Sequence, residues 1–589
     1  MSNYTAPVDD MMFLLNDVFA FEKLMKELPG HEDTGADLAA SILEEAGKFC
    51  SDVIAPLNQS GDQEGCKLEN GTVTTPKGFP EAYKQFCEAG WNGLSADPEF
   101  GGQGLPRVLQ ILFDEMVCSA NLSFGLFPGL TRGAIEALMH HASDDLKSTY
   151  VHKMVSGEWP GVMALTEPHA GTDLGLLSTR AVPQDDGSYK ITGNKIFISS
   201  GDQDFGGNIV HLVLARLSGA PAGVKGISLF VVPKFVPKAD GTSGPRNGVW
   251  VGALEHKMGI HAQPTCQMVY EDAVGWMVGE PNRGLNAKFT MMNAERLFVG
   301  IQGLGIGEAA YQKAQEYAKD RLQSRSPDGT RGPVAIIEHP DVRKMLLQSR
   351  ALTEGGRALA VWTALQMDKA ERHPDAAIRK QADQLVALVT PVIKAALSDF
   401  GFETAVACQQ VFGGHGYVRE WGMEQYVRDA RIAMIYEGTN GVQAMDLVTR
   451  KLTMEGGELP RRFIALVKAE LHAMGAAAGI GELLGPVKES VDRLERVTEA
   501  LQKHATNGAE LGAAATDYLR MFALTAFGWL WARMAAHALE AGADPTPLHR
   551  RKIALAQFFV ARVLPQTLGL ERSIMAGAAP LMELEADLF

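Results

Sequence analysis

Apolar residues recur at the 3.6-residue spacing of amphipathic helices in two parts of the chain, residues 1–160 and the stretch from about 283 to the end. Between these parts, about 120 residues change to short β-branched runs separated by turns rich in Gly, Asp and Pro. This order predicts a multidomain α+β protein in which a sheet domain separates two helical parts.

The middle stretch is predicted to form an antiparallel sheet or a small barrel, because its apolar runs are short and closely spaced. We expect strands within residues 178–184, 188–200, 208–217, 226–235 and 267–275. The helices after it are long, rich in Ala and Leu, and separated by short Gly/Pro breaks, as is typical of a helix bundle. We therefore expect an N-terminal helical domain at 1–160, a middle β domain at 161–282, a helix-bundle domain at 283–455 and an additional C-terminal helical domain at 456–589.

Composition narrows the classes of function. The 589 residues are 46% hydrophobic and 21% charged, which is ordinary for a soluble globular protein, and the net charge of −15 disfavours binding to nucleic acid or to an anionic membrane. The six cysteines are dispersed without any metal-binding spacing, so we expect reduced thiols and no metal site. No basic region precedes an apolar core at the N-terminus, and no run of about 18 apolar residues occurs. We expect a cytoplasmic protein without a membrane span.

Glu437 is the first candidate for chemistry. It follows the apolar run at 432–435 and precedes a Gly-Thr-Asn-Gly turn. A carboxylate at the end of an apolar segment is partly desolvated, which makes it a better proton acceptor. The simpler alternative is a solvated glutamate at the start of a helix that Thr439 or Asn440 caps.

Three stretches in order resemble the acyl-CoA dehydrogenase family of flavoenzymes. They are MALTEPHAGTDLG at 163–175, the arginines Arg296 and Arg321 on one predicted helix, and CQQVFGGHGY with IYEGTNGVQ at 408–417 and 435–443. The resemblance implies a helical domain, a middle β domain and a four-helix bundle, with FAD as cofactor. The region after about 455 is extra, as in the larger members of the family.

The resemblance also assigns the cofactor contacts. The loop at 163–175 would wrap the flavin, with Phe197 and Ser199 beside the ring, where the family has Trp-Ile-Thr and this chain has Phe-Ile-Ser. Arg321, Gln410 and Gly414 would hold the cofactor of a neighbouring subunit, which implies a homo-oligomer, here expected to be a dimer. The expected cofactor-binding residues are Met163, Leu165, Thr166, Gly171, Thr172, Phe197, Ser199, Arg321, Gln410, Gly414 and Thr439.

Two glutamates compete for the role of catalytic base. Most of the family uses the glutamate of the EGT turn, here Glu437, whereas one branch uses a helix glutamate before an arginine, which Glu295 matches. We favour Glu437, because Arg296 offers Glu295 a ready partner. Arg296 and Tyr436 are the expected substrate-binding residues. The implied reaction is α,β-dehydrogenation of an acyl-CoA thioester to a trans-2-enoyl-CoA, with an electron-transfer flavoprotein as acceptor.

The acyl group is a separate question. The chain length, the opening TAPVDDMMFLLNDVF, the GTDLG loop and the extra C-terminal region are most similar to the branch that acts on 3-methylmercaptopropionyl-CoA in bacterial dimethylsulfoniopropionate breakdown. A broad medium- or long-chain enzyme of fatty acid β-oxidation is the alternative, and Phe124, Phe127 and Leu297 are expected near the pocket that separates the two. An acyl-CoA oxidase is a chemical rival. A catalytically idle, DNA-binding flavin relative is disfavoured, since the tail has no dense basic patch.

Overall fold

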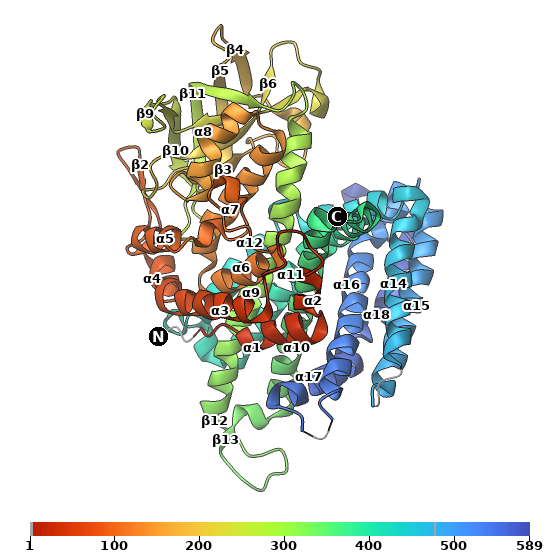
Figure 1. Ribbon diagram of the computed structural model, residues 1–589. Helices are drawn as coiled ribbons and strands as arrows, with labels where there is room; N and C mark the ends of the chain where they lie inside the picture. The colour runs from red at the N-terminus through yellow and green to blue at the C-terminus, as the bar shows by residue number, and fades with distance from the viewer. Residues whose placement is uncertain (1–3, 476–478, 543) are drawn as a thin grey trace. The chain divides into compact units, whose positions relative to one another are not determined.

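The protein is described by a computed structural model that covers residues 4–475, 479–542 and 544–589, without the side chains of 288–294 (Figure 1). The chain forms two compact units. Unit 1 is built mainly from Phe49–Leu105 and Ala120–Phe298, and unit 2 from Asn3–Lys48, Pro106–Ser119 and Val299–Phe589. The first helices are therefore divided between the units, and the C-terminal helices belong to the same unit as the bundle.

A seven-stranded sheet organises unit 1. Its strands are β3 (Gly161–Ala164), β4 (Arg180–Pro183), β5 (Tyr189–Ser199), β6 (Val210–Leu217), β7 (Ile227–Pro233), β10 (Val249–Leu254) and β11 (Thr265–Val278). The pairings β11–β5, β5–β4, β4–β6, β6–β7 and β7–β11 close a ring, with β3 and β10 at its sides. The predicted middle β domain is confirmed, but β6 runs parallel to both β3 and β4, so the sheet is mixed and not purely antiparallel.

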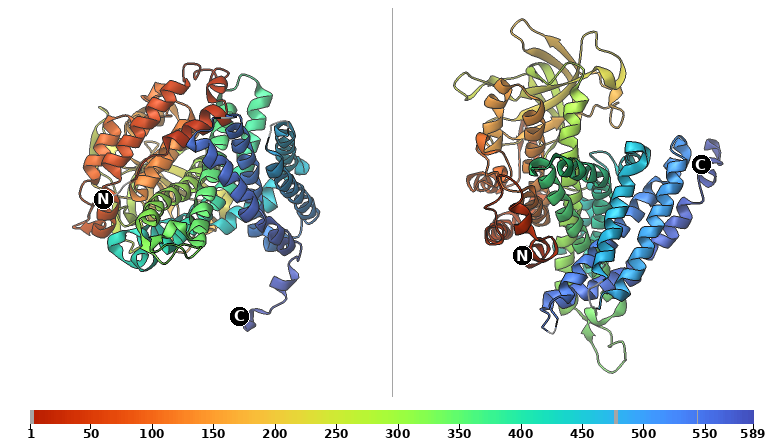
Figure 2. Two further views of the ribbon diagram at one scale, coloured as in Figure 1. Left: turned by 90° about the horizontal axis from the view of Figure 1, so that it is seen from below. Right: turned by 45° about the vertical axis from the view of Figure 1, so that its right-hand side comes forward.

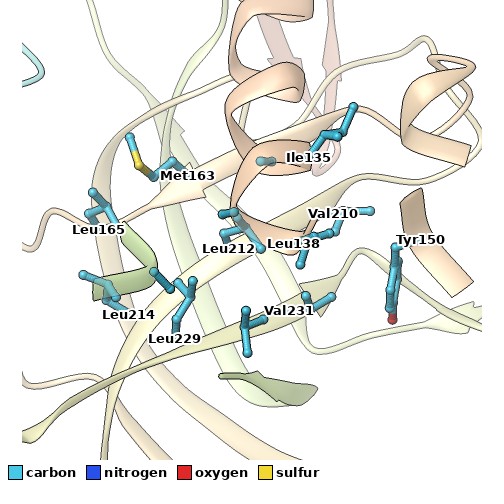
Figure 3. Close-up of a cluster of buried hydrophobic side chains, with 14 of the residues drawn as sticks. Ile135, Leu138, Tyr150, Met163, Leu165, Val210, Leu212, Leu214, Leu229 and Val231 are labelled. Carbon is cyan, nitrogen blue, oxygen red and sulfur yellow. The ribbon is translucent and has the colours of Figure 1, made fainter. Parts of the chain in front are cut away.

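Alternation along the strands places apolar side chains on both faces of the sheet. On β6, Leu212 and Leu214 join one buried cluster, while Val213 joins another. The first cluster lies between the sheet and two helices, α7 (Leu122–His141) and α8 (Asp144–Val155), as Figure 3 shows for side chains such as Leu138 and Tyr150. Burial on both faces explains why these strands read as nearly continuous apolar runs in the sequence.

The helices of unit 1 begin at residues suited to capping. The side chain of Asn121 accepts a hydrogen bond from Phe124 N at the start of α7, and that of Ser143 accepts one from Leu146 N at the start of α8. Unit 1 also contains α4 (Leu57–Glu64), α5 (Phe79–Glu88), the hairpins β1 (Lys67–Glu69) with β2 (Thr72–Thr74) and β8 (Phe235–Pro237) with β9 (Ser243–Arg246), and the first part of α9 (Gly284–Asp320).

Unit 2 is helical. Its bundle helices are the rest of α9, α10 (Pro340–Arg372), α11 (Ala376–Val411), α12 (Met423–Ala433) and α13 (Asn440–Asp446). The helices near its start are α1 (Val8–Phe13), α2 (Phe21–Met25), α3 (Ala36–Phe49) and α6 (Arg107–Ala120). The C-terminal helices are α14 (Glu458–Met474), α15 (Gly481–Lys503), α16 (Gly508–Leu539), α17 (Pro547–Phe558), α18 (Gln566–Ile574) and α19 (Ala579–Met582). Figure 2 shows that α14, α15 and α16, in blue, run side by side.

A buried cluster of charges ties the parts of unit 2 together. Arg357 on α10 contacts Glu115 on α6, Asp10 on α1 and Glu308 on α9, at 2.5–2.7 Å. Lys552 on α17 pairs with Asp10 and, at 2.7 Å, with Glu354 on α10. Arg350 and Arg551 also contact Glu354, so four carboxylates meet four cations. Because unpaired buried charges are costly, this balance fixes how α17 packs on the bundle.

Two helices among the described residues are long and apolar enough to cross a membrane by length and composition alone. One is α11, in which 78% of the most apolar 18-residue window is buried. The other is the continuous segment Pro547–Ile574, which contains α17 and α18 and in which 39% of that window is buried. Core helices of soluble proteins share this length and composition.

Candidate functional site

The turn after α12 holds Glu437 in an unusual backbone conformation. Glu437 has φ 55° and Gly438 has φ 81°, so two consecutive residues are left-handed. For a residue with a Cβ this conformation costs roughly 1–2 kcal/mol, and it persists only where the surroundings fix it. Glu437 itself is partly buried. A strained carboxylate on a fixed turn is a candidate functional group.

Hydrogen bonds on both sides of Glu437 fix this turn. The Gln443 side chain donates to the carbonyl oxygen of Gly438 at 3.0 Å, and Thr439 Oγ1 donates to that of Met434 at 3.1 Å. The Tyr436 hydroxyl, expected at the substrate, donates to Gln302 on α9. Thr439 precedes α13, but its side chain makes no capping hydrogen bond to that helix. Its hydroxyl therefore does not have the capping role that the simpler alternative expects.

The predicted flavin loop begins at the end of β3. The side chains of Met163 and Leu165 are buried in the helix–sheet core, as Figure 3 shows, so only their backbone could face a ligand. The carbonyl oxygen of Thr166 accepts a hydrogen bond from Ile196 N at 2.9 Å, which places the loop beside β5. Phe197 follows directly on that strand. Unit 1 therefore brings together the two segments that the motifs single out.

A buried ion pair supports this loop. Lys195 on β5 donates to Glu167 Oε1 and to the carbonyl oxygen of Leu165, both at 2.9 Å. Glu167 also accepts hydrogen bonds from the hydroxyls of Ser178 and Thr179 at 2.6 Å. Burial acts to raise the pKa of Glu167, but Lys195 and the two hydroxyls outweigh it and lower that pKa to about 2. Burial lowers the pKa of Lys195 to about 8. At neutral pH both groups are thus charged and hold the loop against the sheet.

Replacing Lys195 by methionine is expected to lower the free energy of unfolding by about 3–5 kcal/mol, because Glu167 would keep a buried charge without its cation. The loop at 165–167 would also lose its bond to Lys195, so bound flavin should be released during gel filtration. Lys190→Met, on the same strand at a partly exposed position, is the matched control. Equal stability and flavin content in the two variants would contradict this role of the ion pair.

Phe197 and its neighbours fit a flat cofactor. The Phe197 ring is 59% exposed, and its backbone is left-handed, with φ 58°. Gly171 and Thr172 are also exposed, and no heavy atom lies within 4 Å of the position that a Cβ on Gly171 would take. Ser199, on the same strand, pairs with Thr265. An uncovered aromatic ring beside an open Gly-Thr loop is a surface that an isoalloxazine ring can cover.

Unit 2 brings the three predicted neighbour-subunit contacts close together. Arg321 directly follows the end of α9. Tyr317, in the last turn of that helix, stacks on Phe412 with 4.0 Å between ring centroids and forms a hydrogen bond with His415 Nδ1 at 2.9 Å. Phe412 lies between Gln410 and Gly414 in the sequence. Arg321, Gln410 and Gly414 are all exposed. An arginine beside an open glycine loop suits a diphosphate.

Gln410 also lines a hollow of about 440 Å³ between α10 and α11. This volume is within the range of small-molecule pockets. Thr404, in the wall, is buried, and its hydroxyl has no hydrogen-bond partner among the described residues. The other wall residues are Asp341, Lys344, Met345, Gln348, Ser349, Leu352, Glu403 and Ala407. The hollow is large enough for a small ligand group, and the unpartnered Thr404 hydroxyl is one polar group in its wall.

The second candidate base lies in unit 1. Glu295 is 3% exposed, and its Oε1 is 2.2 Å from the position that a Cβ on Gly133 would take. Only a glycine at this point of α7 leaves room for that carboxylate. Arg296, expected at the substrate, is 6% exposed. The Glu295 side chain is therefore part of the packing between α9 and α7, and Arg296 is buried beside it in the sequence.

The residues expected near the acyl pocket are packed in the core. Phe124, Phe127 and Leu297 are all buried. Phe124 contacts the rings of Phe86 and Phe79, with centroids 5.8 and 6.1 Å apart. Phe124 is thus a core residue of the helical layer, and its place near the acyl pocket stays a prediction.

Sequence reasoning missed two sets of residues around the site. Lys195 and Glu167 were not singled out, although a lysine inside the strand run KIFI signals a buried partner. The same signal occurs at Lys394, a lysine within the apolar stretch of α11 that proves fully buried. A buried charge in an apolar run needs a partner, but the local sequence does not identify which residue that partner is.

Comparisons with known proteins bear on all of these positions. Family models for the acyl-CoA dehydrogenase N-terminal, middle and C-terminal domains match residues 38–158, 162–273 and 282–452, and a model described as acetyl-CoA dehydrogenase C-terminal like matches 463–585. The chain belongs to the acyl-CoA dehydrogenase family. It is therefore an oxidoreductase of a family that binds FAD. The open Gly-Thr loop and the exposed Phe197 side chain are consistent with such a cofactor.

Relatives along the whole chain agree with this. The 3-methylmercaptopropionyl-CoA dehydrogenase of Ruegeria pomeroyi is 44% identical over 95% of this chain and 96% of its own. The broad-specificity linear acyl-CoA dehydrogenase of Mycobacterium tuberculosis is 33% identical over the full length of both chains. The solved structure of Bacillus anthracis acyl-CoA dehydrogenase with FAD is 20% identical, has a TM-score of 0.75, and covers 96% of this chain and 92% of that one, which supports the fold.

Proposed function

We propose that this acyl-CoA dehydrogenase oxidises 3-methylmercaptopropionyl-CoA to methylthioacryloyl-CoA in dimethylsulfoniopropionate catabolism. The observation that carries the proposal is the 44% identity to the Ruegeria pomeroyi enzyme along 95% of the chain. The full-length relative from Mycobacterium tuberculosis favours a second candidate, a broad-specificity enzyme for straight-chain acyl-CoA substrates.

Glu437 removes the α-proton of the thioester in the proposed reaction. Its backbone N–H donates to the thioester oxygen, where negative charge develops as the proton leaves. The left-handed backbone at Glu437 and Gly438 holds this N–H in one orientation before substrate binds. Bound FAD supplies the two-electron acceptor for the β-hydrogen, which leaves as hydride. Tyr436 and Arg296 are proposed to contact the substrate.

FAD is proposed to be held by the residues that the sequence motifs single out. The backbone of Met163, Leu165 and Thr166, with Gly171 and Thr172, forms the loop for the flavin, and Phe197 and Ser199 flank its ring. Thr439 adds a contact from the catalytic turn. Arg321, Gln410 and Gly414, with the hollow beside α11, bind the nucleotide part of a second subunit's cofactor, so the enzyme is a homodimer. An electron-transfer flavoprotein reoxidises it in the bacterial cytoplasm.

A panel of acyl-CoA substrates tests the acyl group. We expect kcat/KM for 3-methylmercaptopropionyl-CoA to exceed that for octanoyl- and palmitoyl-CoA by about tenfold or more, since a pocket fitted to a short chain rejects a longer one. Butanoyl-CoA, similar in length, is the closest control. A higher kcat/KM for octanoyl- or palmitoyl-CoA would instead establish the broad straight-chain enzyme.

Two other classes of function can be tested with the same purified protein. Hydrogen peroxide formed in proportion to product would indicate an acyl-CoA oxidase. Salt-sensitive retention on duplex DNA, with no turnover of any acyl-CoA, would indicate the idle DNA-binding class.

A further inference from the structure

We propose that Asn440 is a positioning residue for Glu437, and that it acts through a buried set of polar groups on α11. The inference rests on the proposed function of Glu437 as base. Asn440 lies three residues after Glu437, at the first position of α13. Its side chain makes no capping bond to its own helix and reaches across to α11 instead.

The contacts of Asn440 use both ends of its amide. Lys394 Nζ donates to Asn440 Oδ1 at 2.8 Å. Asn440 Nδ2 donates to Asp399 Oδ1 at 2.7 Å and to Ser398 Oγ at 3.0 Å. Lys394 and Ser398 have no exposed surface. A buried lysine and a carboxylate on one helix thus bind opposite ends of one amide from the turn.

Asn440 also closes the turn that contains Glu437. Its backbone N–H donates to the carbonyl oxygen of Met434 at 3.0 Å, which ties the two ends of the segment 434–440 together. The left-handed residues Glu437 and Gly438 lie inside this closed segment. The backbone of Glu437 therefore depends on where Asn440 is held, and Asn440 is held by α11.

The chemistry at this position requires an asparagine. Asn440 must accept from a cation and donate to a carboxylate at the same time, and a side-chain amide of this length does both. Aspartate would keep the acceptor for Lys394 but would place a second negative charge beside Asp399. Alanine would leave Lys394 and Asp399 without these bonds to the turn.

Asp399 is itself tuned by the helices around it. Burial raises its pKa to about 6, against the lowering effect of the Asn440 hydrogen bond. The neighbouring Glu403 is paired with Arg520 on α16 at 2.5 Å, and Arg520 lies over the Phe400 ring at 5.0 Å. The C-terminal helix α16 thus packs on the part of α11 that holds the turn.

The test combines activity with an independent measure of the turn. Asn440→Asp is expected to lower kcat by about tenfold or more, with KM changed by less than about threefold, because the base is misplaced while the substrate still binds. Hydrogen exchange of the backbone amides in the peptide 434–443 should become faster. If N440D does not fold, Asn440→Ala takes its place with the same expected results.

A charge-swapped pair distinguishes positioning from general destabilisation. In N440D combined with Asp399→Asn, the amide and the carboxylate exchange places, so both bonds can form again near Lys394. This double variant is expected to recover most of the lost kcat and the slow exchange. The matched control is Asn507→Ala, which removes an asparagine that caps α16 by accepting from Ala509 N and Glu510 N. N507A should lose some thermal stability at unchanged kcat.

The inference and the proposed function can fail separately. If no acyl-CoA is turned over by the wild-type enzyme, the proposed function is wrong, while the exchange data still decide whether Asn440 holds the turn. If the wild type is active but kcat of N440D is unchanged, or if the swapped pair recovers neither kcat nor slow exchange, Asn440 does not position the base.

Discussion

Replacing Glu437 by glutamine is expected to lower kcat by about 10³-fold or more, since a glutamine amide cannot accept the α-proton and general-base catalysis contributes about 10²–10⁴-fold. The substitution keeps the size of the side chain and removes its charge. Bound yellow FAD should therefore remain, and the acyl-CoA should still bind. Steady-state turnover and the flavin spectrum of the same preparation measure both effects.

Glu295→Gln is the matched control for this experiment. Glu295 is buried against Gly133 in the packing of α7 and α9, so its replacement is expected to change kcat by less than about tenfold. The opposite result, with E437Q active and E295Q inactive, would assign the base to Glu295, as in the branch of the family that uses a helix glutamate.

The second large effect is on stability. Lys552→Met is expected to lower the free energy of unfolding by about 3–5 kcal/mol, because Asp10 and Glu354 would stay buried without the cation that pairs with both. Methionine fills a similar volume, so the loss comes from charge and not from a cavity. Chemical denaturation followed by far-UV circular dichroism gives the comparison.

Two further variants make this prediction specific. Arg550→Met, at an exposed position on the same helix, should be nearly neutral. The double variant Glu354→Gln with Lys552→Met removes one carboxylate as well as the cation. It should recover part of the free energy of unfolding that Lys552→Met loses. A double variant less stable than K552M would show that charge balance is not what holds α17 on the bundle.

Much of the fold could be predicted from the sequence, because periodicity reports which face of an element is buried. The five expected strands all occur, and the runs at 208–217 and 226–235 contain β6 and β7. The strands β3 and β10 lie outside the expected runs; β3 is buried throughout, so it shows no alternation of apolar and polar residues. The parallel pairing of β6 with β3 and β4 depends on contacts between distant segments, which no local pattern encodes.

The candidate site was predictable in its motifs but not in its supports. The loop at 163–175, the residues around 410–414 and the turn at Glu437 follow from the sequence. The partners of Asn440 lie 41–46 residues earlier in the chain, at Lys394, Ser398 and Asp399. Such contacts arise only when α13 packs on α11.

Anaerobic addition of 3-methylmercaptopropionyl-CoA to the purified holoenzyme tests the central claim most directly. If the protein removes an α-proton and a β-hydrogen from an acyl-CoA, the yellow flavin absorbance should fall in one turnover, with an equal amount of methylthioacryloyl-CoA formed. The E437Q enzyme, with the same flavin content, should keep its colour. A wild-type enzyme that retains oxidised FAD with this substrate and with butanoyl-, octanoyl- and palmitoyl-CoA would contradict the account.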